Sequence, residues 1–274
     1  MPAPAVKRRV FLGLGGLMLI GVGGCESAAT EPSGSGSPSA LASSSTGQSS
    51  GLLTTSSITS PGTVPGPAQH SPSALAHSID DPSSLWVIVN KHRPLKPQTY
   101  RPADLVRPQV SSAVSGESGL LRAAAARGLE ALAAAAASQG TPLTLVSGFR
   151  SYQTQVATYQ SYANSVGVAG ADHASARPGY SEHQTGLAVD IGDAGGCNLQ
   201  PCFAQRPLAT WASENCHRFG FVVRYQLNFH PISGYFAEPW HLRFVGTELA
   251  TAVKKSGLHT LEQYFGLAAA PSYS

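Results

Sequence analysis

The sequence predicts an α+β fold in which a central antiparallel sheet is flanked by helices. Segments with helical spacing of apolar residues and short apolar runs typical of strands follow one another without the regular alternation that a parallel sheet requires. The part of the 274-residue chain that has such patterns, residues 81–274, is the size of one domain. It contains no internal repeat, so we expect a single folded domain.

The N-terminus has the layout of an export signal. Lys7, Arg8 and Arg9 precede an uncharged apolar run at residues 10–24, as in a secretory signal peptide. The run is shorter than the roughly 20 apolar residues of a membrane span. It leads into Cys25 through a segment that resembles a bacterial lipobox. We expect residues 1–24 to be removed and Cys25 to be lipidated, the alternative being an ordinary secretion signal that contains a cysteine.

Residues 25–80 are expected to form a flexible tether between the membrane and the domain. Ser, Thr, Pro, Gly and Ala dominate this segment, and no charged residue occurs between Glu31 and Asp80. Such a composition buries too little apolar surface to offset the entropy cost of ordering the backbone. We therefore expect a disordered linker here.

The charge of the chain argues against a nucleic-acid partner. Lys7, Arg8 and Arg9 are three of the 18 basic residues, so the chain without its export signal has 15 basic and 15 acidic residues. The basic excess belongs to the signal. The remaining sequence has no basic stripe with interleaved aromatic residues.

The first predicted elements of the domain are a strand, a covering coil and a helix. Residues 85–89 are apolar and suit an opening strand, and the Pro-rich residues 93–108 suit extended coil on the surface. Apolar residues then recur at helical spacing over residues 121–136. The expected ends of this Ala-rich helix are Ser115 or Ser118 as N-cap and Gly140 as stop.

A strand followed by a second helix is predicted next. Residues 143–147 alternate as a strand does, and Ser151 begins a helix that we expect to end before Gly167. Arg150 therefore lies at a strand-to-helix turn. Side chains at such turns point out of the scaffold and are well placed for chemistry.

The second half of the domain supplies the other strands of the predicted sheet. In the strand predicted at residues 186–191, Asp190 shares a face with the small Ala188, which leaves room for a metal ion. A helix is expected to begin at Pro207 and to end before Gly220. The remaining predicted elements are strands at residues 221–225 and 240–245, a helix at residues 247–256 ended by Gly257, and a short helix with the capping box Thr260 and Gln263.

The cysteines other than Cys25 suggest two different roles. Cys197 and Cys202 lie close together in a predicted loop of an exported protein, where a local disulfide is expected. The alternatives for this pair are free thiols or, less simply, zinc ligation. Cys216 lies on the apolar side of a predicted helix, and we expect a buried, unreactive thiol.

His183, Asp190 and His241 are candidate zinc ligands. His183 lies just before the strand that contains Asp190, and His241 lies in another predicted strand. Two adjacent strands can bring such donors within about 2.0–2.2 Å of one ion. The alternative reading is a chance spacing in which each histidine has a structural role.

Glu238 is a spare carboxylate next to these donors. Pro239 disfavours helical geometry at Glu238, so the segment up to His241 is expected to be extended or turned. Catalytic zinc keeps three protein ligands and leaves its fourth position to water. Glu238 can then act as general base, whereas its alternative role is an exposed carboxylate or a salt-bridge partner.

Three ordered motifs resemble a known family. Residues 147–155 read SGFRSYQTQ, residues 181–190 follow the pattern SxHxxGxAxD, and residues 238–246 read EPWHLRFVG. Together they resemble the VanY-type D-alanyl-D-alanine carboxypeptidases, which belong to a zinc peptidase group that includes lysostaphin-like enzymes and hedgehog domains. The resemblance covers residues 89–246 and implies a hedgehog/D,D-peptidase-like fold.

The resemblance also implies roles for individual residues. It implies that zinc is bound by His183, Asp190 and His241, that Glu238 is the catalytic base, and that the peptide end is held by Arg150, Gln155 and Ser181. An arginine suits a terminal carboxylate because its planar donors match the two oxygens, and Arg150 can also steady an oxyanion. The alternatives are a structural ion pair for Arg150, a solvated helix position for Gln155 and a cap for Ser181.

The expected protein is thus an exported, lipid-anchored, monomeric zinc D,D-carboxypeptidase at the outer face of the cytoplasmic membrane. Its implied partners are peptidoglycan stem peptides, from which it would remove the terminal D-alanine. One alternative is L,D-carboxypeptidase or endopeptidase action on the same polymer. The other is a non-catalytic cell-wall binding module that contains zinc.

Overall fold

The computed structural model describes residues 77–273. The predicted export signal, Cys25 and all but the last residues of the predicted tether lie outside the described residues. Within residues 77–273, no helix combines the length and the apolar character needed to cross a membrane.

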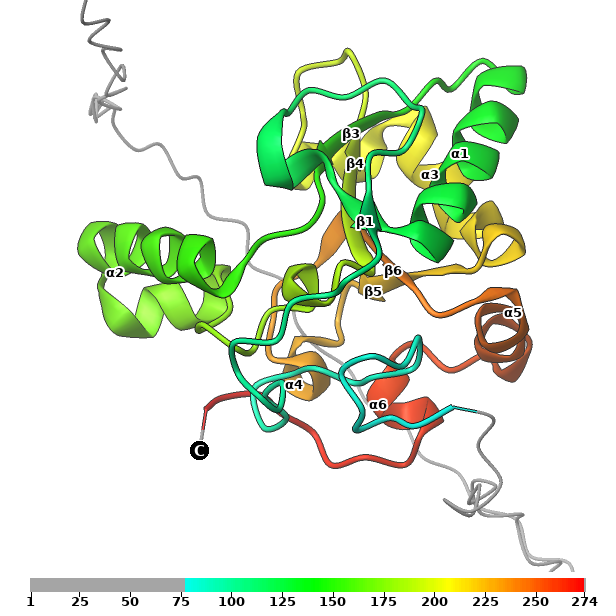
Figure 1. Cartoon of the computed structure of the whole chain (residues 1–274). Coiled ribbons are helices and arrows are strands. Elements are labelled where there is room, and N and C mark those ends of the chain that lie inside the picture. The colour runs from blue at the N-terminus through cyan, green and yellow to red at the C-terminus, as the bar shows by residue number, and fades with distance from the viewer. Residues whose placement is uncertain (1–76, 274) are drawn as a thin grey trace, which may run out of the picture. The chain divides into compact units, whose positions relative to one another are not determined.

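A four-stranded antiparallel sheet lies at the centre of the domain, which confirms the predicted fold class (Figure 1). Its strands, in spatial order, are β3 (Thr144–Ser147), β4 (Ala188–Gly192), β6 (Glu238–Phe244) and β5 (Phe221–Tyr225). A separate two-stranded sheet pairs β1 (Leu105–Val106) with β2 (Leu121–Arg122).

Helices cover the sheet and bury its apolar side chains. The α-helices are α1 (Ala123–Ser138), α2 (Tyr152–Ala174), α3 (Pro207–Asn215), α4 (His230–Ser233), α5 (Thr247–Ser256) and α6 (Leu261–Tyr264). Leu129 and Leu132 of α1 share one core cluster with Val189 of β4 and Leu242 of β6. A second, smaller cluster packs α5 and α6 against β5. The first cluster therefore covers one face of the sheet, whereas the second covers only the β5 edge of the other face.

Four 3₁₀ helices connect these elements: η2 (Gly116–Gly119), η3 (Glu182–Thr185), η4 (Pro201–Gln205) and η5 (Cys216–Phe219). η3 matters most for the site because it leads directly into β4. Its C-cap, Gly186, has φ 67°, a left-handed conformation that glycine adopts without steric cost. The chain therefore turns sharply from η3 into the central strand.

α2 begins as predicted and extends further than predicted. The side chain of Ser151 caps it by accepting a hydrogen bond from the backbone N–H of Thr154. Gly167 has φ 74° and ψ 168°, so it kinks the helix, which then continues to Ala174. Figure 1 shows α2 standing away from the sheet, on the side opposite α1 and α5.

The prediction of an opening strand at residues 85–89 is wrong. The segment is buried but pairs with no strand. Three of its carbonyl oxygens are bound by arginine side chains instead: Arg243 Nη2 donates to Leu85 O and Val87 O, and Arg93 Nε donates to Ile88 O. These bonds satisfy the backbone without a ladder.

Two element boundaries also differ from prediction. α1 has Arg122 as its N-cap rather than Ser115 or Ser118, because the preceding residues are drawn into β2. β6 begins at Glu238 rather than at residue 240, because Glu238 pairs with Tyr225 of β5. Glu238 is thus fixed in a strand. The helix predicted from Pro207 up to Gly220 ends at Asn215, and η5 takes up the rest of the predicted span. The other predicted strands and helices are confirmed to within one to three residues, including the cap of α6 by Thr260.

Candidate active site

The structure brings His183, Asp190 and His241 together. One ligand atom from each lies within 4.8 Å of the others, and all three residues are buried. His183 comes from η3, while Asp190 and His241 are direct cross-strand partners in β4 and β6. Paired positions on neighbouring strands place side chains about 4.5–5.5 Å apart at Cβ. The register of this strand pair therefore positions two of the three donors.

Hydrogen bonds on the far side of each imidazole ring decide which nitrogen faces the cluster. His183 Nδ1 lies 2.7 Å from Gly148 O, so this nitrogen carries the proton and Nε2 is free. His241 Nε2 lies 3.3 Å from Glu182 Oε2, which leaves Nδ1 free in the same way. Metal-binding histidines in proteins are usually held by such second contacts.

Zinc fits this donor set. His183 Nε2 lies 3.3 Å from Asp190 Oδ2, and His241 Nδ1 lies 3.1 Å from Asp190 Oδ1. Two ligand atoms bound tetrahedrally at about 2.1 Å from an ion are about 3.4 Å apart. Asp190 Oδ1 is also a buried atom without a hydrogen-bond partner among residues 77–273, as a metal-binding oxygen would be.

The charges of the cluster favour a bound cation. Burial disfavours a charged imidazole, yet the neighbouring carboxylates of Asp190 and Glu182 raise the pKa of His241 to about 10. Burial also opposes the ionised form of Asp190, but the adjacent His183 and His241 hold its pKa below the ordinary range. The carboxylates thus create a buried negative field that a proton or a metal ion balances.

Glu238 lies beside the metal donors. Its Oε2 is 3.6 Å from His241 Nδ1, and its side chain is 23% exposed. Burial raises the pKa of Glu238 to about 7, and His241 partly opposes this shift. Within residues 77–273 it forms no ion pair with arginine or lysine. A carboxylate with a pKa near neutrality can both accept and return a proton.

Arg150 presents an unpaired positive charge to the site. Its Nη1 donates to Gln155 Oε1 at 3.0 Å, and its Nη2 reaches Ser147 Oγ at 3.4 Å. No carboxylate of residues 77–273 lies within 4.0 Å of the guanidinium, so the alternative of a structural ion pair is not observed. The half-buried charge remains available for an anion.

Gln155 contacts Arg150 from within the protein, whereas Ser181 lines the same cavity as Arg150. Gln155 is fully buried, and its amide donates to Ala176 O at 2.6 Å and Ser175 Oγ at 3.2 Å. Gln155 is therefore placed to orient the guanidinium of Arg150, and it does not occupy a solvated helix position. Ser181 is 3% exposed, makes no capping hydrogen bond to η3 and lines the cavity.

Apart from the buried Gln155, these groups line one cavity of about 340 Å³. The metal donors, Arg150, Ser181 and Glu238 form its polar wall. Tyr225 and Tyr235 also line the cavity, and the ring of Tyr225 lies 4.9 Å from those of both His241 and Tyr235. Phe236 and Leu199 line the rim and are 59% and 46% exposed. The cavity thus combines a polar, charged wall with an apolar rim.

Leu199 belongs to a loop closed by a disulfide between Cys197 and Cys202, whose Cα atoms are 5.6 Å apart. The predicted cross-link therefore borders the cavity. Cys216 is a free thiol buried at the start of η5. Its burial raises its pKa to about 12.

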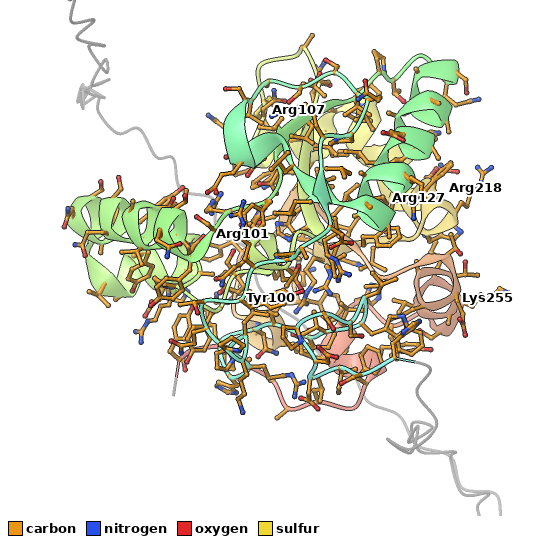
Figure 2. All side chains as sticks on the ribbon, in the orientation of Figure 1. Tyr100, Arg101, Arg107, Arg127, Arg218 and Lys255 are labelled. Atoms are coloured by element: carbon orange, nitrogen blue, oxygen red, sulfur yellow. A yellow bond between two sulfur atoms is a disulfide. The ribbon has the colours of Figure 1, made fainter. Side chains whose placement is uncertain are left out.

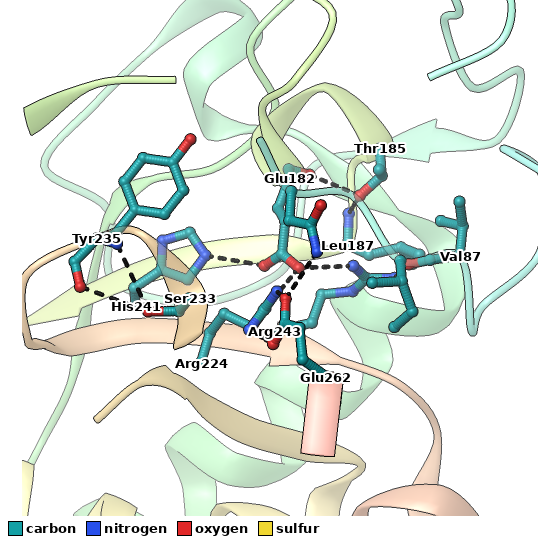
Figure 3. Close-up of polar contacts among 12 residues, drawn as sticks. Val87, Glu182, Thr185, Leu187, Arg224, Ser233, Tyr235, His241, Arg243 and Glu262 are labelled. Carbon is teal, nitrogen blue, oxygen red and sulfur yellow. Dashed lines mark hydrogen bonds and ion pairs between the residues drawn. The ribbon is translucent and has the colours of Figure 1, made fainter. Parts of the chain in front are cut away.

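Glu182 is the residue of the site that the sequence did not reveal. It precedes His183 in η3, and its fully buried side chain contacts His241 from behind. Arg224 and Arg243 bind the same carboxylate, as Figure 3 shows. A usable signal was present in the sequence: Arg224 interrupts the otherwise apolar strand FVVRY, Arg243 lies between Leu242 and Phe244, and a buried arginine requires an acidic partner.

Comparison with known proteins agrees with the geometry. The family described as VanY, D-alanyl-D-alanine carboxypeptidase, matches residues 118–247. The putative carboxypeptidase YodJ of Bacillus subtilis (strain 168) is 38% identical over 191 residues, which cover 69% of each chain.

Solved structures extend the likeness to the fold. The LdcB LD-carboxypeptidase is 37% identical, with a TM-score of 0.64 over 68% of this chain and 88% of that one. A mutant of the vancomycin resistance D,D-pentapeptidase VanY in complex with Zn(II) is 32% identical, with a TM-score of 0.55 over 66% of this chain and 98% of that one. With its motifs assembled around one cavity, the chain belongs to the VanY family of D-alanyl-D-alanine carboxypeptidases.

Proposed function

We propose that this protein is a zinc-dependent carboxypeptidase that removes the C-terminal D-alanine from peptidoglycan stem peptides. The observation that carries the proposal is the cavity-lining Arg150, which has no carboxylate partner among residues 77–273. A carboxypeptidase must bind a terminal carboxylate, and a guanidinium offers it two parallel donors. The D-Ala-D-Ala carboxypeptidases of the family support the substrate class.

The residues divide the work as follows. Zinc held by His183, Asp190 and His241 would polarise the scissile carbonyl and acidify water. Glu238 takes a proton from the attacking water and returns it to the leaving amine, for which its pKa of about 7 is well matched. Arg150 holds the terminal carboxylate, while Ser181 offers a neutral hydroxyl and Gln155 orients the guanidinium.

L,D-carboxypeptidase action is the second candidate, and one observation favours it. The LdcB LD-carboxypeptidase has both the higher identity, 37% against 32%, and the higher TM-score, 0.64 against 0.55, when set beside the D,D-pentapeptidase VanY. Both reactions release a terminal D-alanine, so both use the carboxylate contact of Arg150. They differ in the configuration of the residue that precedes the cut bond.

Two other activities receive less support. An endopeptidase has no use for a free cation at the end of its cavity, because its substrate continues past the cut. A non-catalytic module with structural zinc would close the fourth ligand position and would need no general base. Glu238 lies 3.6 Å from His241 Nδ1, where a structural zinc site would need no such carboxylate.

Defined stem peptides test the proposal. We expect the zinc-loaded protein to shorten a pentapeptide ending in D-Ala-D-Ala by one D-alanine, detected by mass spectrometry. Glu238→Gln should lower kcat about 10²- to 10⁴-fold while zinc stays bound. The matched control is Glu214→Gln, an exposed carboxylate on α3. A tetrapeptide stem that ends in a single D-alanine is tested in parallel. Shortening of the tetrapeptide but not of the pentapeptide would establish L,D specificity, and release of D-alanine from neither peptide would refute the proposal.

We also propose that the protein is exported and held at the outer face of the cytoplasmic membrane through Cys25. The support is the sequence: the basic and apolar export signal, the lipobox-like segment and the linker. In a bacterial host, the full chain should fractionate with membranes, and Cys25→Ser should release it from them. Equal membrane binding of both forms would contradict the anchor.

A further inference from the structure

A buried charge cluster contacts His241, one of the candidate metal ligands (Figure 3). The side chains of Glu182, Arg224, Arg243 and Glu262 are fully buried. Two negative and two positive charges thus balance within the cluster. An isolated charge costs several kcal/mol to bury. Removing one member of the cluster would therefore leave a buried, unpaired charge and destabilise the fold.

Glu182 connects this cluster to His241. Its Oε2 lies 3.3 Å from His241 Nε2, on the side of the ring away from Asp190. Its Oε1 accepts from Arg224 Nε at 2.8 Å and from Arg243 Nη1 at 3.0 Å. One oxygen is therefore committed to the two arginines, and the other is left to face the imidazole.

The arginines are themselves fixed to distant parts of the chain. Arg224 donates through Nη1 and Nη2 to Glu262 of α6 at 2.9 and 2.6 Å. Arg243 donates through Nη2 to the backbone oxygens of Leu85 and Val87. The carboxylate of Glu182 cannot rotate without breaking its own bonds to Arg224 and Arg243, so these two arginines fix its position relative to β6.

We infer that Glu182 is the positioning residue that selects the metal-binding nitrogen of His241 and strengthens the metal site, an inference that rests on the zinc site of the proposed function. A carboxylate acceptor keeps the ring proton on Nε2, so the lone pair of Nδ1 points toward Asp190. It also makes the ring a more basic ligand. Gly148 O performs the first of these tasks for His183, but a neutral carbonyl supplies less of the second.

The test measures zinc affinity in two matched variants. Glu182→Gln keeps the size of the side chain but removes the charge that faces His241. We expect it to weaken zinc binding about 10- to 100-fold, the usual range for such contacts, in a competition titration against a chromophoric chelator. Glu262→Gln is the control, because it removes an equally buried carboxylate from Arg224 without touching His241. It should lower the Tm but change zinc affinity less than threefold.

A structural role alone would lower Tm in both variants and leave zinc affinity equal in both. That result, or wild-type zinc affinity in Glu182→Gln, would overturn the inference.

A second measurement needs no variant and so does not depend on whether Glu182→Gln folds. In the ¹¹³Cd-loaded, ¹⁵N-histidine-labelled wild-type protein, we expect scalar coupling of cadmium to Nδ1 of His241 and a slowly exchanging proton on Nε2. Coupling through Nε2 of His241 would contradict the inference. Neither experiment measures peptide cleavage, so a protein that binds metal in this way but cuts no stem peptide would refute the proposed function alone.

Discussion

At the scale of single residues, each ionisable group of the site has its own environment. Arg150 faces the cavity without an acidic partner among residues 77–273, Glu238 is partly buried beside His241, and Cys216 is sealed in the core. Burial acts in the same direction on the last two, since it raises the pKa of both the carboxyl and the thiol. Glu238 keeps access to the cavity and can exchange a proton there, whereas Cys216 has no access to solvent and is unreactive.

Arg150→Lys should raise the KM for stem peptide about 10- to 100-fold, because a lysine cannot replace two parallel hydrogen bonds to a carboxylate. Steady-state kinetics with defined peptides measures the change. Arg127→Lys is the control: Arg127 is exposed on α1 and points outward in Figure 2. Amidation of the peptide's C-terminus should impair the wild type strongly and Arg150→Lys little. Equal impairment of both would show that Arg150 does not bind the carboxylate.

Cys216 should not react with Ellman's reagent in the folded protein at pH 8. Burial raises its pKa to about 12, so the reactive thiolate is nearly absent, and the reagent cannot reach it. In a Cys25→Ser background without reductant, one thiol should appear on unfolding in guanidinium. Cys216→Ser should remove that thiol. Rapid labelling of the native protein would show that the core opens at η5.

At the scale of elements, the strands were largely predictable and the turns between them were not. β3, β4 and β5 follow from apolar patterns, and Pro207 and Gly257 correctly mark helix ends. The 3₁₀ turn that holds His183 has no such pattern. Its shape depends on Gly148 O and on Gly186, contacts that exist only after the strands have assembled.

The missed elements have a common cause. Residues 85–89 look like a strand, but side chains bind their backbone oxygens: Arg243, 156 to 158 residues further along, binds Leu85 O and Val87 O, and the nearby Arg93 binds Ile88 O. The same long-range bonding hid Glu182, whose partners lie 42 to 61 residues away. By contrast, the metal donors and Glu238 stood out because their motifs are local in sequence.

Close packing of α1 reverses the usual effect of replacing a helical glycine. Alanine is favoured over glycine in a helix by about 1 kcal/mol. A Cβ on Gly128, however, would lie 2.8 Å from both Phe219 O and the Phe244 ring. Gly128→Ala should therefore destabilise the protein by about 1–3 kcal/mol, measured by urea unfolding. Ala134→Gly, at an exposed position of the same helix, is the control. It measures the difference in helix propensity between alanine and glycine without any clash. A stabilised Gly128→Ala would show that α1 can shift away from η5.

At the scale of the whole molecule, the buried charge cluster joins segments from both ends of the domain. Glu262 lies in α6 near the C-terminal end of the described chain, and Asn90, near its beginning, donates to the same carboxylate at 3.0 Å. Arg224 lies between them in β5. Breaking the cluster should therefore lower the free energy of unfolding of the whole domain.

The cluster predicts a specific dependence of stability on pH. Burial alone would raise the pKa of Glu262, but Arg224 and Asn90 lower it below its ordinary value of 4.5. The folded state therefore holds the ionised form more tightly than the unfolded state does. This contribution is complete above pH 4.5 and is lost as the pH falls through the folded-state pKa.

Glu262→Gln should accordingly be less stable than the wild type by about 3–5 kcal/mol at pH 7. The difference should shrink below pH 4.5, because the wild-type carboxylate becomes protonated there. Thermal unfolding of both proteins between pH 7 and pH 3 measures it. A difference that does not vary with pH would mean that the charge of Glu262 contributes nothing to stability.

The register of β4 against β6, in which Asp190 stands opposite His241, has a consequence for folding. An ion that binds both residues ties together positions 51 residues apart in sequence, much as a covalent staple would. Side chains alternate between the two faces of a sheet, so a slip by a single residue would turn His241 to the wrong face and break the staple. A metal ion bound at this site would therefore select for correct strand pairing: only the correctly aligned sheet could hold the ion, and the ion would in turn stabilise that alignment.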